Sequence, residues 1–269
     1  MSHLKAIALS LIFIFCLLAS PANSQVKPLR NAHAHNDYKH KHPLCDAMRC
    51  GFMSFEADVF LKNGKLIVAH LSPFLKYKTA EELYFKPLYD SVIKNKGSVY
   101  ASGTSPVILL IDIKSDAGKT YEALKPLLEK YAAMLTWAAN GTVHQGAVTV
   151  ILSGHKPYAA LQQESHRLAF IDQPLLNVAE PAKDSSVYAL ASCKYSSVMS
   201  WKGKGDIDKA EENKLKALVA LTHSQGKKVR LWASPENKEV WEMLLKNGVD
   251  LINTDELEEL KIFLLTEQK

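Results

Sequence analysis

Short apolar runs alternate with longer amphipathic stretches along most of the chain. The runs predict buried strands and cover residues 29–35, 53–61, 66–70, 107–113, 147–152, 168–171, 187–191, 229–232 and 249–253. The amphipathic stretches predict helices over residues 42–49, 79–94, 119–139, 157–165, 207–225, 238–247 and 256–265. This alternation indicates an α/β protein with a parallel sheet that is covered by helices.

The count of strands selects one architecture within this class. Asn63-Gly64 separates the second run from the third and is the strongest short signal for a β-hairpin. We therefore interpret residues 66–70 as a return strand, which leaves eight strands for strand-helix units. The sequence thus favours a single (β/α)₈ TIM barrel over an open doubly wound sheet, which would more often show a glycine-rich phosphate loop after its first strand.

The first residues differ from the rest of the chain. Lys5 precedes an apolar stretch over residues 6–19, and Ala22 and Ser24 are the small residues that a signal peptidase requires. The stretch is too short for a comfortable membrane span. We therefore predict a secretory signal peptide over residues 1–24 and a barrel domain over residues 25–269, in a secreted or periplasmic protein without a stable membrane anchor.

The charge of the chain argues against a nucleic-acid partner. The formal net charge of +5 is spread along the sequence, and lysine outnumbers arginine. Proteins that bind nucleic acids typically cluster their basic residues and interleave them with aromatic ones. We expect a small-molecule substrate instead.

Charged side chains gather where the predicted strands end. They form three pairs with i, i+2 spacing and one single histidine: His33 with His35, Glu56 with Asp58, Asp112 with Lys114, and His70. Residues two apart lie on one face of a strand, with Cα atoms roughly 6.5 Å apart. Because barrel enzymes carry their catalytic residues at the carboxyl ends of the strands, we expect these side chains to converge at one mouth of the barrel.

Three carboxylates at one mouth predict a cation site. If Glu56, Asp58 and Asp112 are unpaired, their mutual repulsion implies a bound divalent cation. A ligand set of oxygens with room for water suits one Mg²⁺ or Ca²⁺ better than Zn²⁺.

The hairpin allows a prediction about His70. A two-residue Asn63-Gly64 turn pairs residues whose numbers add up to 127, which places His70 opposite Ala57 and out of phase with Glu56 and Asp58. If His70 acts together with these carboxylates, we expect a bulge or a loop of odd length in the hairpin.

These segments resemble the phospholipase-C-like phosphodiesterases, whose best-known members are the glycerophosphodiester phosphodiesterases. H-A-H-N-D-Y and F-E-A-D-V-F-L-K-N-G-K-L-I-V-A-H are similar to the family's first block, L-L-I-D-I-K to its third strand, and K-V-R-L-W and D-L-I-N-T-D to its last two strands. H-N-D-Y together with L-Y-F-K-P-L is similar to the branch named for altered inheritance of mitochondria protein 6. One departure is that H-N-D and H-P stand where glycerophosphodiesterases usually have H-R-G and E-N.

The resemblance implies a metal-dependent phosphoric diester hydrolase that acts on a glycerophosphodiester or a phospholipid-derived substrate. It implies that Glu56, Asp58 and Asp112 hold the metal and that Lys114 contacts the phosphate. It also implies attack by a neighbouring hydroxyl of the substrate, which gives a cyclic phosphate that is released or opened.

Two histidines would transfer the protons. One of them is His70, and the other is His35 or His33; the distance to the Glu56-x-Asp58 pair favours His35, with His33 as its possible supporting partner. We further expect Asn36, Trp232 and Asn253 to contact the substrate.

Two other functions stay open. H-x-H at the end of a first strand also occurs in binuclear amidohydrolase-like metallohydrolases, for which His155 and Asp255 could supply ligands, although Glu56 and Asp112 would then lack roles. The other alternative is a secreted barrel that binds a lipid or a phosphosugar without turnover, because a fold alone does not establish activity.

Overall fold

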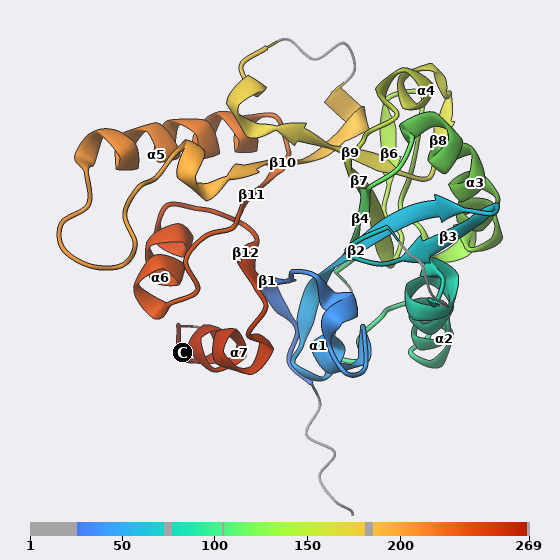
Figure 1. Cartoon of the computed structure of the whole chain (residues 1–269), viewed down its shortest axis with the longest axis horizontal. Coiled ribbons are helices and arrows are strands. Elements are labelled where there is room, and N and C mark those ends of the chain that lie inside the picture. The colour runs from blue at the N-terminus through green and yellow to red at the C-terminus, as the bar shows by residue number, and fades with distance from the viewer. Residues whose placement is uncertain (1–25, 73–76, 104, 181–184, 268–269) are drawn as a thin grey trace, which may run out of the picture.

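Eight parallel strands form a nearly closed barrel with the helices on its outside (Figure 1). The computed structural model of the chain describes residues 26–72, 77–103, 105–180 and 185–267. The strand order is β11-β10-β9-β7-β4-β2-β1-β12, and a parallel bridge between Arg230 and Leu251 links β11 to β12. The predicted TIM barrel is therefore confirmed.

The barrel strands follow the apolar runs closely, because aliphatic and β-branched side chains suit a sheet that is buried on both faces. The strands are β1 (Leu29–Ala34), β2 (Phe52–Lys62), β4 (Val107–Ile113), β7 (Val148–Gly154), β9 (Phe170–Pro174), β10 (Tyr188–Lys194), β11 (Lys228–Trp232) and β12 (Ile252–Thr254). The helices are α1 (Cys45–Arg49), α2 (Lys86–Lys94), α3 (Ala117–Lys130), α4 (Tyr158–Gln163), α5 (Lys209–Ser224), α6 (Lys238–Lys246) and α7 (Leu257–Glu267).

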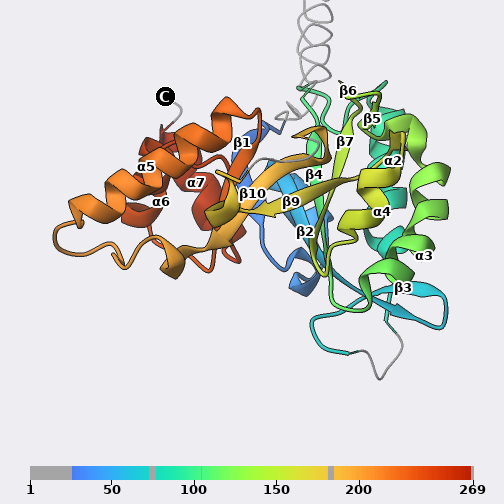
Figure 2. The ribbon, with the colours of Figure 1, turned by 90° about the horizontal axis from the view of Figure 1, so that it is seen from above.

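The predicted hairpin is present. Strand β3 (Lys65–Val68) pairs antiparallel with β2, from Lys62 opposite Lys65 to Val59 opposite Val68, so that paired residue numbers add up to 127. Asn63 and Gly64 both have positive φ angles, 51° and 73°, as a type I′ turn requires. In Figure 2 the hairpin lies on the side of the barrel away from α5, α6 and α7.

One predicted helix differs from the structure. The helix expected over residues 119–139 ends at Lys130, and its last part is strand β5 (Trp137–Ala139) of a small antiparallel sheet with β6 (Thr142–His144) and β8 (His166–Arg167). Asn140 and Gly141, with φ angles of 50° and 75°, form the turn between β5 and β6.

The unit after β9 has no α-helix among its described residues, whereas eight complete strand-helix units would require one. The described residues between β9 and β10 form only two short 3₁₀ helices, Leu175–Asn177 and Ser185–Val187.

The inside of the barrel has an apolar floor below a polar layer. The apolar floor consists of Ile108, Leu110, Ile151, Phe170, Leu190 and Leu251. Two positions further along, where the side chain points to the same face again, the strands carry polar residues: Asp112, Ser153, Asp172, Ser192 and Asn253. The polar layer therefore lies toward the carboxyl ends of the strands.

The predicted signal peptide, residues 1–24, lies outside the described residues. Among the residues that the structure describes, none of the helices combines the length and the apolar character needed to span a bilayer.

Candidate active site

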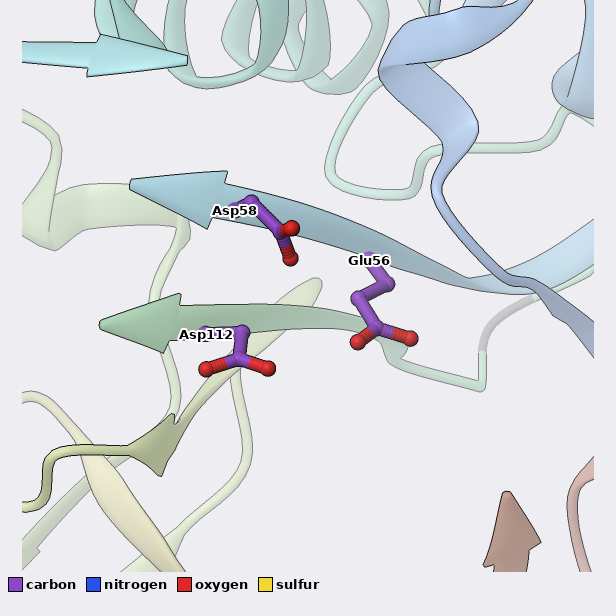
Figure 3. Close-up of side chains that lie close together, drawn as sticks. All are labelled: Glu56, Asp58 and Asp112. Carbon is purple, nitrogen blue, oxygen red and sulfur yellow. The ribbon is translucent and has the colours of Figure 1, made fainter. Parts of the chain in front are cut away.

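Three carboxylates from two neighbouring strands lie together inside the barrel (Figure 3). Strands β2 and β4 pair in parallel with Asp58 opposite Asp112, and Glu56 precedes Asp58 by two residues on the same face. Each residue offers an oxygen, and these oxygens lie within 4.8 Å of one another. The structure therefore brings together the three residues that the sequence predicted as metal ligands.

The sequence prediction assumed that these carboxylates are unpaired, but in the structure they contact two cations. Lys114 Nζ lies 2.8 Å from Asp112 Oδ2 and 3.4 Å from Asp58 Oδ1. Arg230 Nη2 lies 2.5 Å from Glu56 Oε2. Two permanent cations thus relieve part of the repulsion that the prediction assigned wholly to a bound metal.

Room for a further cation nevertheless remains. Asp112 Oδ1 is buried and has no hydrogen-bond partner among the described residues, and the buried Asp58 Oδ1 has only its ion pair with Lys114 at 3.4 Å. Beside Asp112 lies Gly154, which has a φ of 66°, and a Cβ at this position would overlap Asp112 Oδ1. Because a buried oxygen without a partner is costly and carboxylates are the usual ligands of Mg²⁺ and Ca²⁺, the three residues fit a divalent cation.

The pKa values in this cluster follow from burial and from the neighbouring cations. Burial opposes the ionisation of Glu56, but the Arg230 guanidinium and the hydrogen bond to His33 outweigh it and hold the pKa of Glu56 well below its usual range. Burial raises the pKa of Asp112, and Lys114 offsets only part of this effect.

His33 is fully buried beneath the carboxylates. Its Nδ1 lies 2.7 Å from Ser54 Oγ and its Nε2 lies 3.1 Å from Glu56 Oε2. Burial and the nearby Arg230 lower the pKa of His33 to about 4. His33 is therefore a neutral side chain with both ring nitrogens engaged and no exposed surface.

His35 lies at the mouth, where 28% of its side chain is exposed. Its Nδ1 lies 2.8 Å from Asp255 Oδ1, a carboxylate that directly follows β12, the strand that pairs with β1. A proton on Nδ1 that is donated to Asp255 leaves Nε2 as an acceptor, and Asn36 Nδ2 lies 3.1 Å from this atom. Asn36 has a φ of 47°, a left-handed conformation that asparagine tolerates well.

His70 reaches the carboxylates without a bulge, so the predicted bulge or odd-length loop is wrong. The hairpin ladder ends at Val68, and the chain then turns, although Ala69 still donates its N–H to the main-chain oxygen of Asp58 over 3.1 Å. This turn brings His70 Nδ1 to 3.3 Å from Asp58 Oδ2. His70 therefore reaches Asp58 because the chain changes direction after the paired residues of β2 and β3, and not because of a bulge between these strands.

Tyr38 connects His35 and His70. Its hydroxyl lies 2.7 Å from Asp58 Oδ2, 2.8 Å from Asn36 Oδ1 and 3.1 Å from His70 Nδ1. Since Asn36 also contacts His35, a chain of polar contacts runs from one histidine to the other. The two histidines therefore belong to one site.

The remaining predicted residues lie at two depths. Trp232 ends β11 at the mouth and is 40% exposed. Asn253 is buried, and its Oδ1 accepts hydrogen bonds from Nε and Nη2 of Arg230 at 2.9 and 2.7 Å. His155, which the binuclear alternative would need as a ligand, contacts the main-chain oxygen of Ser115 through Nδ1 at 2.8 Å.

Sequence reasoning assigned no role in the phosphodiesterase site to four residues of the polar layer and the mouth: Tyr38, Asp172, Arg230 and Asp255. Arg230 and Asp172 interrupt apolar strands. A charged residue within such a strand requires a partner or a function, so the sequence could have indicated both residues as candidates for the site. A tyrosine or an aspartate that follows a strand is common in turns and gave no such signal.

The site and its barrel agree with a known family of proteins. Residues 21–172 match the AIM6-like phosphodiesterase domain, and the chain belongs to this family. It is 30% identical to the altered inheritance of mitochondria protein 6 homolog of Arthroderma benhamiae, over 84% of this chain and 81% of that protein. It is 29% identical to altered inheritance of mitochondria protein 6 of Eremothecium gossypii, over 88% of this chain and 70% of that protein.

A solved structure shares the fold. The crystal structure of a glycerophosphodiester phosphodiesterase from Parabacteroides distasonis matches with a TM-score of 0.53 and 14% sequence identity, over 90% of this chain and 100% of that chain. The family resemblance that the sequence motifs indicated is thereby confirmed.

The prediction of a secreted or periplasmic protein is wrong by the same comparison. The relatives are named altered inheritance of mitochondria protein 6, and this name refers to mitochondria rather than to secretion. The prediction depended on residues 1–24, which lie outside the described part of the chain.

Proposed function

We propose that the chain is a cation-dependent phosphoric diester hydrolase whose substrate is a glycerophosphodiester or a phospholipid-derived compound. One observation carries the proposal: His35 and His70, each with Nδ1 next to a carboxylate, share a mouth with the carboxylate cluster and Lys114. The phosphodiesterase family and the glycerophosphodiester phosphodiesterase fold neighbour support the class of reaction.

The histidines move the protons in this proposal. Asp255 orients His35, and Asp58 and Tyr38 orient His70, so that Nε2 of each ring remains for proton transfer. One histidine accepts the proton of the attacking hydroxyl or water as the new P–O bond forms. The other donates a proton to the alkoxide that leaves as the old P–O bond breaks.

The nucleophile that we propose is a neighbouring hydroxyl of the substrate. Its attack gives a cyclic phosphate and a free alcohol, and the cyclic phosphate is then released or opened by water. In the opening step the two histidines exchange their roles, because the leaving oxygen is now the one that attacked before.

Negative charge at the phosphoryl oxygens would be balanced by a cation that the carboxylate cluster holds and by Lys114. A divalent cation, Mg²⁺ or Ca²⁺, bound by Glu56, Asp58 and Asp112 would neutralise the negative charge that develops on these oxygens. Lys114 adds a permanent positive charge at the same place.

Two further side chains complete the proposed substrate site. Asn36 donates to the phosphate, and the exposed face of Trp232 contacts the head group. Because His33 is buried and neutral, we assign to it the support of Glu56 rather than proton transfer; likewise, Asn253 holds Arg230 rather than the substrate.

A substrate screen tests the proposal. Purified protein is incubated with glycerophosphodiesters, lysophospholipids and bis-p-nitrophenyl phosphate in the presence of Mg²⁺ or Ca²⁺, and then again after treatment with EDTA. We expect hydrolysis of at least one diester, its loss on chelation and its return when the cation is restored. Bound cation without hydrolysis of any diester would instead support a binding barrel without turnover.

Histidine variants test the assignment of roles. His35→Ala and His70→Ala should bind the cation as the parent does and should lose hydrolysis by a factor of about 10² to 10⁴, which is the usual contribution of a positioned acid or base. His223→Ala is the matched control, because His223 lies in α5 and contacts Asp250 rather than the mouth.

A further inference from the structure

The permanent charges of the carboxylate cluster do not cancel. Glu56, Asp58 and Asp112 carry three negative charges, and the two cations in contact with them, Lys114 and Arg230, carry two positive ones. The cluster therefore keeps a net charge of −1. A divalent cation would change this to +1, and a phosphodiester, which carries one negative charge, would then bring it to zero.

Arg230 is held rigidly in this arrangement. It is only 3% exposed, and it reaches Glu56 on β2 from β11, with β12 and β1 between these strands. Its Nη2 contacts Glu56 Oε2, while its Nε and Nη2 donate to Asn253. A guanidinium with these fixed contacts remains beside Glu56 when another cation arrives, and its repulsion is weakened little by solvent at this depth.

We propose that Arg230 is a built-in counter-charge that keeps the affinity of the site for a divalent cation low until a singly charged phosphodiester is present. Cation and diester then bind with positive cooperativity, because each one neutralises the charge imbalance that the other creates. The inference rests on the proposed function and specifies how that site is loaded. By linkage, the cation must strengthen the binding of the diester by the same factor.

A purely structural role for Arg230 makes the opposite prediction. If Arg230 only holds Glu56 in position, its removal weakens cation binding. If it is a counter-charge, its removal strengthens cation binding, because Glu56 then lacks its positive partner and the metal supplies the missing charge. The sign of the change in affinity separates the two roles.

The first experiment uses the full chain and no variant. Mg²⁺ is titrated by calorimetry alone, then with ethyl methylphosphonate, which carries one negative charge, and then with the uncharged dimethyl methylphosphonate. We expect Mg²⁺ to bind about tenfold more tightly with the charged phosphonate, within the usual range of coupling between two sites, and unchanged with the uncharged one. Equal Mg²⁺ affinity in all three titrations would overturn the inference.

The second experiment removes the counter-charge. Arg230→Met should bind Mg²⁺ about tenfold more tightly than the parent in the absence of phosphonate and should respond less to the phosphonate. Arg230→Lys retains the positive charge and should restore the parent's behaviour. Arg167→Met is the matched control, since Arg167 is also a buried arginine but lies in β8, outside the barrel.

The outcomes separate this inference from the proposed function. Weaker Mg²⁺ binding in Arg230→Met would contradict the counter-charge while leaving the metal site in place. An enzyme that hydrolyses diesters but binds Mg²⁺ independently of the phosphonate would overturn only the inference. If neither Mg²⁺ nor Ca²⁺ binds in any mixture, both are wrong. Should Arg230→Met fail to fold, Arg230→Gln, which also removes the positive charge, gives the same comparison.

Discussion

Two walls of the barrel mouth hold buried carboxyl groups in contrasting ways. The charged wall, on β2 and β4, consists of Glu56, Asp58 and Asp112, which Lys114 and Arg230 contact. The hydroxyl wall is formed by β7, β9 and β10, and its members are Ser153, Asp172 and Ser192. Asp58, Asp112 and the three residues of the hydroxyl wall lie in the polar layer, and Glu56 lies two positions before Asp58, opposite Leu110 of the apolar floor.

The hydroxyl wall contacts its carboxyl group through hydroxyl groups rather than through a cation, and Asp172 Oδ1 is buried without a hydrogen-bond partner among the described residues. Asp172 Oδ2 lies 2.5 Å from Ser192 Oγ and 3.3 Å from Ser153 Oγ, and no ammonium or guanidinium of the described residues lies within ion-pair distance of this carboxyl. Lys156 donates to the main-chain oxygen of Asp172 instead, at 2.9 Å.

The contrast shows that burial alone does not decide the state of a carboxyl group. Burial raises the pKa of Asp172, whereas in Glu56 the same effect is outweighed by Arg230 and the pKa falls. We therefore expect the charged wall to determine binding and catalysis and the hydroxyl wall to determine mainly stability.

The largest expected effect lies in the charged wall. Asp112→Asn removes one of three ligand charges and the partner of Lys114, so we expect diester hydrolysis to fall by a factor of at least about 10³, as when a charge-stabilising group is lost from an active site. Steady-state kinetics with saturating Mg²⁺ measures this loss. Asp116→Asn is the control, because Asp116 caps α3 by accepting from the Lys119 N–H, and an asparagine caps equally well. Similar losses in both variants would contradict a special role of Asp112.

A smaller effect on stability is expected in the hydroxyl wall. Because the pKa of Asp172 is raised in the folded state, its ionisation opposes folding, and stability is lost as the pH rises above the unfolded value of roughly 3.9. The amide side chain in the Asp172→Asn variant cannot ionise. The free energy of unfolding of Asp172→Asn should therefore increase relative to that of the parent as the pH rises, by about 1–3 kcal/mol, which is the cost of an unsatisfied buried polar group.

Urea unfolding of both proteins is measured at about pH 4 and about pH 7.5. Most of the ionisation of a buried aspartate falls between these two pH values. Asp172→Asn should also retain most of the hydrolytic activity per folded molecule. A difference in unfolding free energy that is the same at both pH values, or a loss of activity as large as that of Asp112→Asn, would erase the distinction between the walls.

The smallest expected effect on hydrolysis comes from removing the Tyr38 hydroxyl, which contacts Asp58 of the charged wall. Tyr38→Phe removes the contact of Tyr38 with Asp58 and His70 but leaves the ring in place. We expect kcat to fall by a factor of about ten, because one hydrogen bond to a charged group contributes about 1.5 kcal/mol. Steady-state kinetics with saturating Mg²⁺ measures this loss, and an unchanged kcat with a lower Tm would instead indicate a structural role.

The strands of the fold were predictable because each one is a local apolar run. Val107–Ile113 matches its predicted boundaries, and the Asn63-Gly64 turn determined the register of the hairpin. The failures were local ambiguities: Trp137–Ala139 continues the apolar pattern of α3 but pairs as a strand, because the next two residues form a tight turn.

The part of the site that could be predicted consists of residues whose position follows from the pattern of a single strand and from the order of the strands. Glu56, Asp58 and Asp112 could be grouped from spacing and strand order alone. The contact of His35 with Asp255 joins residues that are 220 positions apart, and that of Arg230 with Glu56 joins residues 174 positions apart. Such contacts depend on how the barrel closes, which no local pattern encodes.

Gly154 offers a way to sort related sequences. It ends β7 beside Asp112 on β4, and any side chain there would occupy the space of the Asp112 carboxylate. A chain with the same strand pattern but a larger residue at this position has no room for the third acid in its present place. A glycine at the position of Gly154 would therefore mark the relatives that can build this cluster, although the glycine itself contributes no chemical group to it.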